Sequence, residues 1–156
     1  MLEKDRAGNI GKKRLKISEV LKRLASEGVT NPQQKFKKNN SGWVDSKKGG
    51  KVYCASGWEK IRVNTLDNNP LVSSFQKDKI RIKYEILGVI HVYIVDFLIK
   101  YENRELVLEE VKPKLGFYDS TETEVSKAKF IAARKHCILN GWTFRVIDTK
   151  ESLLDL

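Results

Sequence analysis

The sequence predicts an α+β domain in which a helix, three strands in a meander, a second helix and a final strand follow one another, behind a basic N-terminal helix and arm. Three observations predict this order. Residues 79–86 alternate apolar and charged side chains, residues 89–100 form a longer apolar run, and residues 122–139 carry apolar residues at helical spacing. With 156 residues, 40% of them hydrophobic, the chain is long enough for one domain with a real core.

The first third of the chain is expected to hold one helix and an arm. A helix is predicted over residues 17–27, ended by Gly28, because its apolar residues share one face: Ile17, Val20, Leu21 and Leu24. Residues 30–51 are expected to form a loop or turn-rich arm with Phe36 and Trp43 among lysines. These aromatics could stack on bases or wedge into a groove, or they could anchor the arm on the core, and both interpretations stay open.

The core elements follow from residue 53. Residues 56–67 predict a short helix whose inward face holds Trp58, Ile61, Thr65 and Leu66. The three strands of the meander are expected over residues 79–86, 89–100 and 105–112, with turns at Gly88 and Asn103. Pro113 ends the third strand because it cannot donate to a ladder.

The chain closes with a helix and a strand. The helix over residues 122–139 is expected to face inward with Val125, Ala128, Ala132 and either Ile138 or Leu139. Gly141 caps it, and a strand over residues 143–148 follows.

The charge of the chain is concentrated at its N-terminal end. Residues 1–52 contain 14 Lys and Arg against five acids, so they carry +9 of the total net charge of +10. Such a patch is typical of a protein that binds a polyanion, since binding releases counterions. The alternative is a solvated basic tail without a partner. We expect a basic, polyanion-binding arm over residues 1–52 and a core domain over residues 53–156.

Several classes of protein are not indicated. No run approaches the roughly 20 apolar residues of a membrane span, and the N-terminus lacks the apolar region of a signal peptide. Cys54 and Cys137 are too few for a disulfide framework or a zinc cluster, and Cys137 is expected to be a small buried thiol. An intracellular, reduced location is therefore expected.

Charged residues at the ends of two apolar strands are the main sign of chemistry. Glu110 and Lys112 are two residues apart and share a face, whereas Glu109 points the other way. A hairpin turning near residues 101–104 could bring Asp96 beside Glu110. Two close carboxylates repel one another, and Mg²⁺, which prefers oxygen ligands and keeps several waters, would relieve this. A structural ion pair of Lys112 with Asp96 or Glu110 is the competing interpretation.

The pattern VDF-x12-EVK resembles the PD-(D/E)XK nuclease superfamily, with Asp96, Glu110 and Lys112 at the signature positions and Val95 in place of the usual proline. The resemblance extends over about 100 residues to phage-encoded, TnsA-like members, through VYCASGWEKIRVNTLDNNPLVSSF and the closing segment SKAKFIAARKHCILNGWTFRVID. It implies a restriction-endonuclease-like αβββαβ core with a mixed sheet. It also implies a third acid, Glu59, on the first helix of the core.

The resemblance implies a Mg²⁺-dependent DNA endonuclease, with Mn²⁺ as a possible substitute, that leaves 5′-phosphate and 3′-hydroxyl ends. Asp96 and Glu110 would bind the metal, Glu59 would be a further ligand or position the water, and Lys112 would orient or activate it. Such sequences occur among phage homing endonucleases, and a homing role in the cytoplasm of a bacterial host is preferred. A phage packaging or head-completion protein and a catalytically silent DNA-binding module remain alternatives.

Double-stranded DNA is the expected partner, and cutting both strands would need a dimer, a higher oligomer or two nicks. Lys127 and Lys129 open the last helix, where they could face a phosphate or form a solvated face. The residues expected to hold DNA are Lys12, Lys13, Arg14, Lys35, Lys37, Lys38, Trp43, Lys47 and Lys48.

Overall fold

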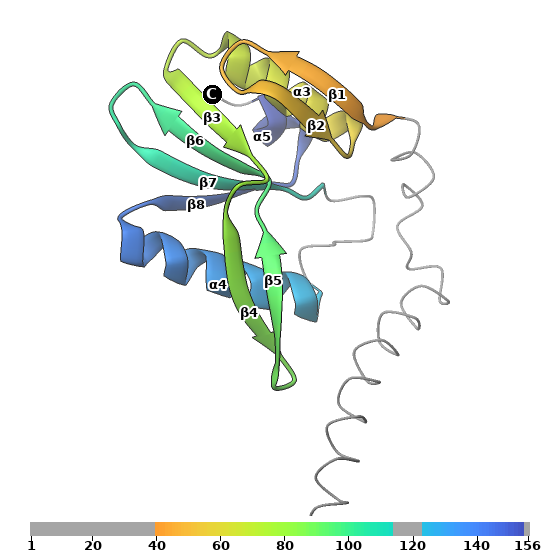
Figure 1. The fold of residues 1–156 in the computed structure, drawn as a ribbon, viewed down its shortest axis with the longest axis vertical. Coiled ribbons are helices and arrows are strands. Elements are labelled where there is room, and N and C mark those ends of the chain that lie inside the picture. The colour runs from red at the N-terminus through yellow and green to blue at the C-terminus, as the bar shows by residue number, and fades with distance from the viewer. Residues whose placement is uncertain (1–39, 114–122, 155–156) are drawn as a thin grey trace, which may run out of the picture.

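A four-stranded mixed sheet forms the centre of the computed structural model, which describes residues 40–113 and 123–154 (Figure 1). The strands lie in the order β3 (Val72–Lys77), β6 (Phe97–Tyr101), β7 (Leu106–Val111) and β8 (Thr143–Ile147). The pairs β3–β6 and β6–β7 are antiparallel, whereas β7 and β8 are parallel. A parallel neighbour requires a crossover connection, and α4 (Glu124–Asn140) lies in it.

Helices cover both faces of this sheet. On one side, α3 (Gly57–Asn68) and α5 (Lys150–Leu154) pack with the hairpin β1–β2 over a core that includes Val63, Phe97 and Leu153. On the other side, α4 and the hairpin β4–β5 enclose a second core around Tyr93, Leu108 and Cys137. The buried Cys137 thiol confirms its predicted place. None of the described helices is long and apolar enough to cross a membrane.

The hairpin β4–β5 is the outer half of a long bent ribbon. β4 (Arg81–Ile86) follows β3 in the chain, and β5 (Val89–Ile94) precedes β6. The N–H of Asp78 donates to the carbonyl of Asp96, and the N–H of Val95 donates to that of Ile80, each at 3.0 Å. These bonds pair the two strands of the ribbon at the bend between its inner and outer halves. The outer half leaves the sheet at this point (Figure 1).

The single strand predicted over residues 89–100 is therefore wrong. The strand is interrupted at Val95 and Asp96, where the Asp96 side chain turns to the backbone of β7 and accepts the N–H of Val111. The inner half, β6, belongs to the central sheet, and the outer half, β5, belongs to the hairpin. Two further elements were not predicted at all, β3 and α5.

The predicted fold class is confirmed. In chain order, α3, β3, β6, β7, α4 and β8 give the expected αβββαβ core with a mixed sheet, and β4–β5 is inserted between its first two strands. The segment predicted as a loop over residues 30–51 is described from residue 40, and that part forms β1 (Gly42–Ser46) and the start of β2 (Gly50–Cys54) instead. This hairpin spans the boundary predicted between residues 52 and 53, and the division into arm and core stays a prediction.

Both helices predicted in the core form, but their buried faces differ from the expected ones, and the helix predicted over residues 17–27 lies outside the described residues. In α3 the buried residues are Glu59, Arg62, Val63 and Leu66, and Ile61 is exposed. In α4 they are Ser126, Phe130, Ala133 and Cys137, whereas Ile138 and Leu139 are 78% and 86% exposed. The row that is buried is thus not the predicted one, although Ala132 is partly buried against the second core. Gly141 ends α4 in the left-handed conformation, as predicted, with φ 69°.

Candidate active site

Asp96 and Glu110 form a pair of acids at the end of the central strands. Asp96 lies at the bend before β6, and its Oδ2 accepts the N–H of Val111 at 2.8 Å. Glu110 precedes Val111 on β7, so this bond fastens one acid to the strand that carries the other. The structure therefore brings together the two residues that the sequence predicted would meet.

The electrostatics of the pair show how closely the two acids interact. Burial raises the pKa of Asp96 well above its usual range, although part of the residue reaches solvent, and the carboxylates of Glu110 and Glu59 raise it further. Burial likewise raises the pKa of Glu110, against the charges of Lys112 and Lys129, which lower it. Ionising both acids together is therefore costly without a cation.

One carboxylate oxygen of Glu110 lacks a hydrogen-bond partner in the described part of the chain. Among the described residues, the buried Glu110 Oε2 and the buried hydroxyl of Tyr93 have no hydrogen-bond partner. The two groups lie close enough for Tyr93 to lower the pKa of Glu110, while burial and then Glu110 strongly raise the pKa of Tyr93. A buried carboxylate oxygen without a donor is costly, and a bound cation would satisfy it.

Glu59 lies at the first turn of α3 and has structural partners. Ser56 caps the helix by accepting the N–H of Glu59 at 3.3 Å, and Glu59 Oε2 accepts the N–H of Ala55 at 2.8 Å. This arrangement is close to a capping box, in which a serine and a glutamate three residues later satisfy the first turn. Glu59 is nevertheless near enough to Asp96 to raise its pKa.

Lys77 completes this side of the site, and the sequence did not predict it. It ends β3, its side chain is 4% exposed, and its Nζ lies 2.9 Å from Glu59 Oε2. Burial lowers the pKa of Lys77, but the carboxylates of Glu59, Asp96 and Asp78 outweigh this effect and raise it overall. The amine is therefore a fixed positive charge among the acids.

Lys112 follows β7, and its backbone N–H donates to the carbonyl of Ile147 at 2.8 Å. The charge of its ammonium lowers the pKa of Glu110, which places it on the side of the acid pair. Lys129 reaches the same region from α4, with Nζ 5.2 Å from the ring centroid of Tyr93. The first turns of α4 thus contribute a positive charge at the edge of the site.

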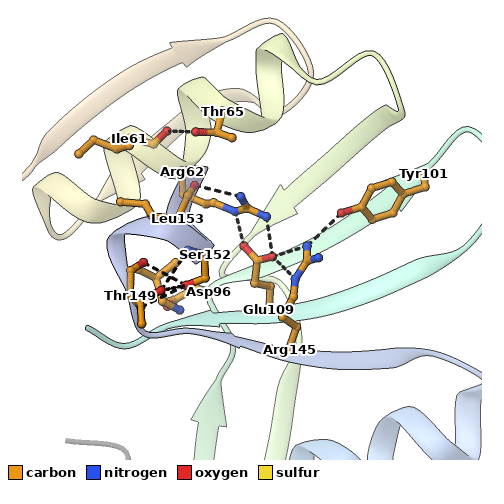
Figure 2. A network of polar contacts seen from close by, with 11 residues as sticks. Ile61, Arg62, Thr65, Asp96, Tyr101, Glu109, Arg145, Thr149, Ser152 and Leu153 are labelled. Atoms are coloured by element: carbon orange, nitrogen blue, oxygen red, sulfur yellow. Dashed lines mark hydrogen bonds and ion pairs between the residues drawn. The ribbon is translucent and has the colours of Figure 1, made fainter. Parts of the chain in front are cut away.

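Glu109 serves the opposite face of the sheet, as predicted. Its fully buried carboxylate accepts from Arg62 Nε at 2.6 Å and Nη2 at 2.9 Å, and from Arg145 Nε at 2.8 Å (Figure 2). Arg62 also donates to the carbonyl of Leu153, and Arg145 donates to the hydroxyl of Tyr101. These contacts give Glu109 a structural role that joins α3, β7, β8 and α5.

The donor set fits a divalent cation in part. Asp96 and the open oxygen of Glu110 offer hard oxygen ligands of the kind that Mg²⁺ and Mn²⁺ prefer. Within residues 40–113 and 123–154, no three His, Cys, Asp or Glu side chains converge closely enough to hold a metal by themselves. The acid pair therefore suits an ion that keeps several water ligands, while Glu59 faces Lys77.

Of the residues predicted to hold DNA, three lie in the described part of the chain. Trp43 is 65% exposed and contacts Tyr53 edge-on at 5.6 Å between ring centroids, with Lys51 Nζ 6.0 Å from its ring. It does not anchor an arm in the core, and an exposed aromatic beside a lysine is available for stacking. The others lie outside the described residues: Lys12, Lys13, Arg14, Lys35, Lys37 and Lys38, together with Phe36.

Lys47 and Lys48 lie in the turn between β1 and β2. Their backbone N–H groups both donate to the carboxylate of Asp67 on α3, at 3.1 Å. The ammonium of Lys48 donates to the carbonyl of Asn69, where it satisfies the end of α3. Lys48 thus has a structural partner, whereas Lys47 is exposed.

Comparison with known families agrees with this geometry. A family model described as "TnsA-like endonuclease N terminal" matches residues 69–149, which is just over half of the chain. The matched segment contains Lys77, Asp96, Glu110 and Lys112, and it begins after Glu59. No curated protein matches the chain.

Proposed function

Because the chain belongs to the TnsA-like endonuclease N-terminal family, we propose that it is a metal-dependent DNA endonuclease whose active site is centred on Asp96 and Glu110. The observation that carries this proposal is the acid pair itself. Burial raises the pKa of both carboxylates, and the charge of Glu110 raises that of Asp96 further. Among the described residues, the buried Oε2 of Glu110 has no hydrogen-bond partner. Such an arrangement destabilises the fold, which favours a functional explanation over a structural one.

Each residue of the site has a distinct role in this proposal. Asp96 and Glu110 hold the cation, and the bond from Val111 to Asp96 fixes the direction in which one carboxylate points. Lys112 orients the attacking water or neutralises the charge that develops on the phosphate. Glu59 is the third acid, and Lys129 faces the substrate phosphate from α4.

A bound Mg²⁺ or Mn²⁺ would lower the pKa of a water and stabilise the leaving oxygen of the phosphodiester. The protein positions that chemistry through the rigid sheet. Asp96 directly precedes β6, which pairs with the strand of Glu110, and its side chain is bound to the N–H of Val111, so backbone hydrogen bonds set the position of both acids. The expected products carry 5′-phosphate and 3′-hydroxyl ends.

The test is cleavage of supercoiled plasmid with Mg²⁺, with Mn²⁺ and with chelator. Asp96→Asn, Glu110→Gln and Lys112→Ala should each lower the rate by at least about a hundredfold, the scale for removing one electrostatic interaction from a transition state. Matched controls are Glu85→Gln and Lys83→Ala, whose side chains are exposed on β4. Full activity of the Asp96 and Glu110 variants, or full activity in chelator, would contradict the assignment.

For the biological role we propose a phage homing endonuclease that acts in the host cytoplasm on double-stranded DNA. The described part of each chain offers one such acid pair, so a double-strand break requires a homo-oligomer or two successive nicks. Discrete fragments from a long DNA substrate would support homing. Nonspecific degradation would favour a packaging or head-completion role, and DNA binding without cleavage would favour a silent binding module.

A further inference from the structure

The ammonium group of Lys77 lies at the centre of the acids on the β3 side of the site. Its Nζ contacts Glu59 Oε2 at 2.9 Å and Asp78 Oδ2 at 3.0 Å. It also lies 5.4 Å from the ring centroid of Phe97, the neighbour of Asp96 in the chain. A buried ammonium is costly unless it is paired, so these contacts hold it firmly among the carboxylates.

The ion pair is not needed to satisfy Glu59 as a helix cap. The N–H of Ala55 already binds the same carboxylate, and Ser56 caps the helix without Lys77. An apolar side chain at the end of β3 would continue the row that contains Phe75, two residues earlier. The position instead carries a cation directed at acids, which points to a role in the charge balance of the site.

The charges around the site add up in a specific way. Four carboxylates carry four negative charges when ionised: Glu59, Asp78, Asp96 and Glu110. Lys77 and Lys112 carry two positive charges. One divalent cation neutralises the remainder, whereas two would leave an excess of two positive charges. With the charge of Lys129 included, one cation leaves one positive charge and two leave three, so a single cation stays closer to neutrality.

We propose that Lys77 takes the place of a second metal ion, so that the site binds a single divalent cation through Asp96 and Glu110. The proposal rests on the metal-dependent nuclease function proposed above. Lys77 is a positioning residue: it holds Glu59 by an ion pair and neutralises the side of Asp96 that faces β3. Glu59 is then the counter-ion of Lys77 and not a ligand of the metal.

The experiment is a Mn²⁺ titration of the full-length protein without DNA, in which electron paramagnetic resonance measures free Mn²⁺ and calorimetry measures the number bound. Wild type should bind one Mn²⁺ per chain, and so should Lys79→Met, a control at an exposed lysine two residues further along. Lys77→Met should bind two, because it frees Glu59 and removes the positive charge near Asp96, and Lys77→Arg should restore one. Glu59→Gln should still bind one, with an affinity changed by less than about tenfold.

Two Mn²⁺ ions bound to wild type would overturn the proposal, as would failure of Glu59→Gln to bind Mn²⁺ or a single ion in folded Lys77→Met. If Lys77→Met does not fold, wild type and Glu59→Gln still decide between the two arrangements. A wild-type protein that binds no Mn²⁺ would contradict the metal-dependent function itself, and that result is distinct from binding two ions.

Discussion

Asp96 Oδ2 accepts the backbone N–H of Val111 at 2.8 Å, so the acid at the bend of the ribbon is tied to the strand that carries Glu110. This bond fixes the position of a carboxylate whose ionised form is disfavoured by its surroundings. Burial, Glu110 and Glu59 all raise the pKa of Asp96. An ionised Asp96 thus lowers the free energy of unfolding, and this effect can be measured as a dependence of stability on pH.

Asp96→Asn should stabilise the metal-free protein at pH 8 by an amount on the order of 1 kcal/mol, as removal of an unfavourable charge commonly does. Asparagine can still accept the N–H of Val111 through its carbonyl. Because the pKa is raised in the folded state, wild type loses stability as the pH rises from the unfolded pKa through the folded pKa. The advantage of the variant should therefore shrink at pH 5.

Urea denaturation in chelator at both pH values measures this difference. Asp45→Asn, at an exposed carboxylate on β1, is the matched control and should change stability little at either pH. A wild type that is more stable than Asp96→Asn at pH 8 in chelator would show that the acid is not strained.

Glu109 and Glu110 are adjacent acids with opposite expected effects. Glu109→Gln leaves the buried guanidinium of Arg62 without its carboxylate, which should cost about 3 kcal/mol of unfolding free energy. Glu110→Gln removes a charge whose pKa is raised by burial, so it should leave stability unchanged or increase it. Each variant is the control for the other.

Thermal and urea unfolding of the two variants, with cleavage assays alongside, separates the structural acid Glu109 from Glu110, the acid proposed to be catalytic. Equal decreases in stability would be inconsistent with the two faces of β7 having different tasks.

Trp43→Ala should weaken DNA binding without affecting stability, because Trp43 is exposed and its ring packs edge-on against the surface residue Tyr53. If it stacks on a base, the substitution should cost about 1–3 kcal/mol of binding free energy. Fluorescence anisotropy with labelled DNA, in parallel with urea unfolding, measures both quantities. Leu71→Ala, an exposed apolar residue before β3, is a control for nonspecific effects.

Six basic residues before position 40 should set the salt dependence of DNA binding: Lys12, Lys13, Arg14, Lys35, Lys37 and Lys38. Replacing all six with glutamine should lower the slope of log affinity against log salt by up to about 0.9 for each phosphate that the protein no longer neutralises. Anisotropy titrations over a range of salt concentrations measure the slope. An unchanged slope would mean that this charge is not part of the DNA footprint.

Leu87→Asn should stabilise the hairpin β4–β5 by an amount on the order of 1 kcal/mol. Leu87 has φ 52° and Gly88 has φ 75°, so the turn needs a left-handed conformation at a position where leucine is strained. Asparagine adopts this conformation more readily, and little burial is forfeited because Leu87 is 54% exposed. Leu71→Asn, at a residue without positive φ, is the control in thermal unfolding.

Two-residue periodicity was sufficient to put Glu109 and Glu110 on opposite faces of their strand, and the predicted hairpin brought Asp96 beside Glu110. The catalytic roles of Asp96, Glu110 and Lys112 stay predictions. It did not reveal β3, since a bulge between Val72 and Ser74 interrupts the alternation. Lys77 was missed with that strand, and a buried lysine has no pattern that separates it from an exposed one. Charged residues also follow Lys77 in the sequence, so its own charge did not mark it as a buried residue.

The buried face of α4 was misplaced for a different reason. Apolar residues occur on more than one side of this helix, and Ile131, Ile138 and Leu139 are exposed. Periodicity alone cannot choose between two apolar rows when the neighbouring strands decide which is buried. The hairpin β1–β2 was hidden because its strands have only five residues each and the residues that connect them, Lys47, Lys48 and Gly49, are typical of a loop.

The bend in the ribbon at Asp78 and Asp96 also separates the hairpin β4–β5, whose length can vary, from the central sheet, whose geometry positions the acids. Residues inserted or deleted in pairs near Leu87 and Gly88 alter only how far the hairpin extends, because a change of two keeps every side chain on its original face. A change of one would shift the register between β4 and β5. The length of the hairpin β4–β5 can therefore differ between relatives, while the carboxylate of Asp96 at its base keeps its position beside the central sheet.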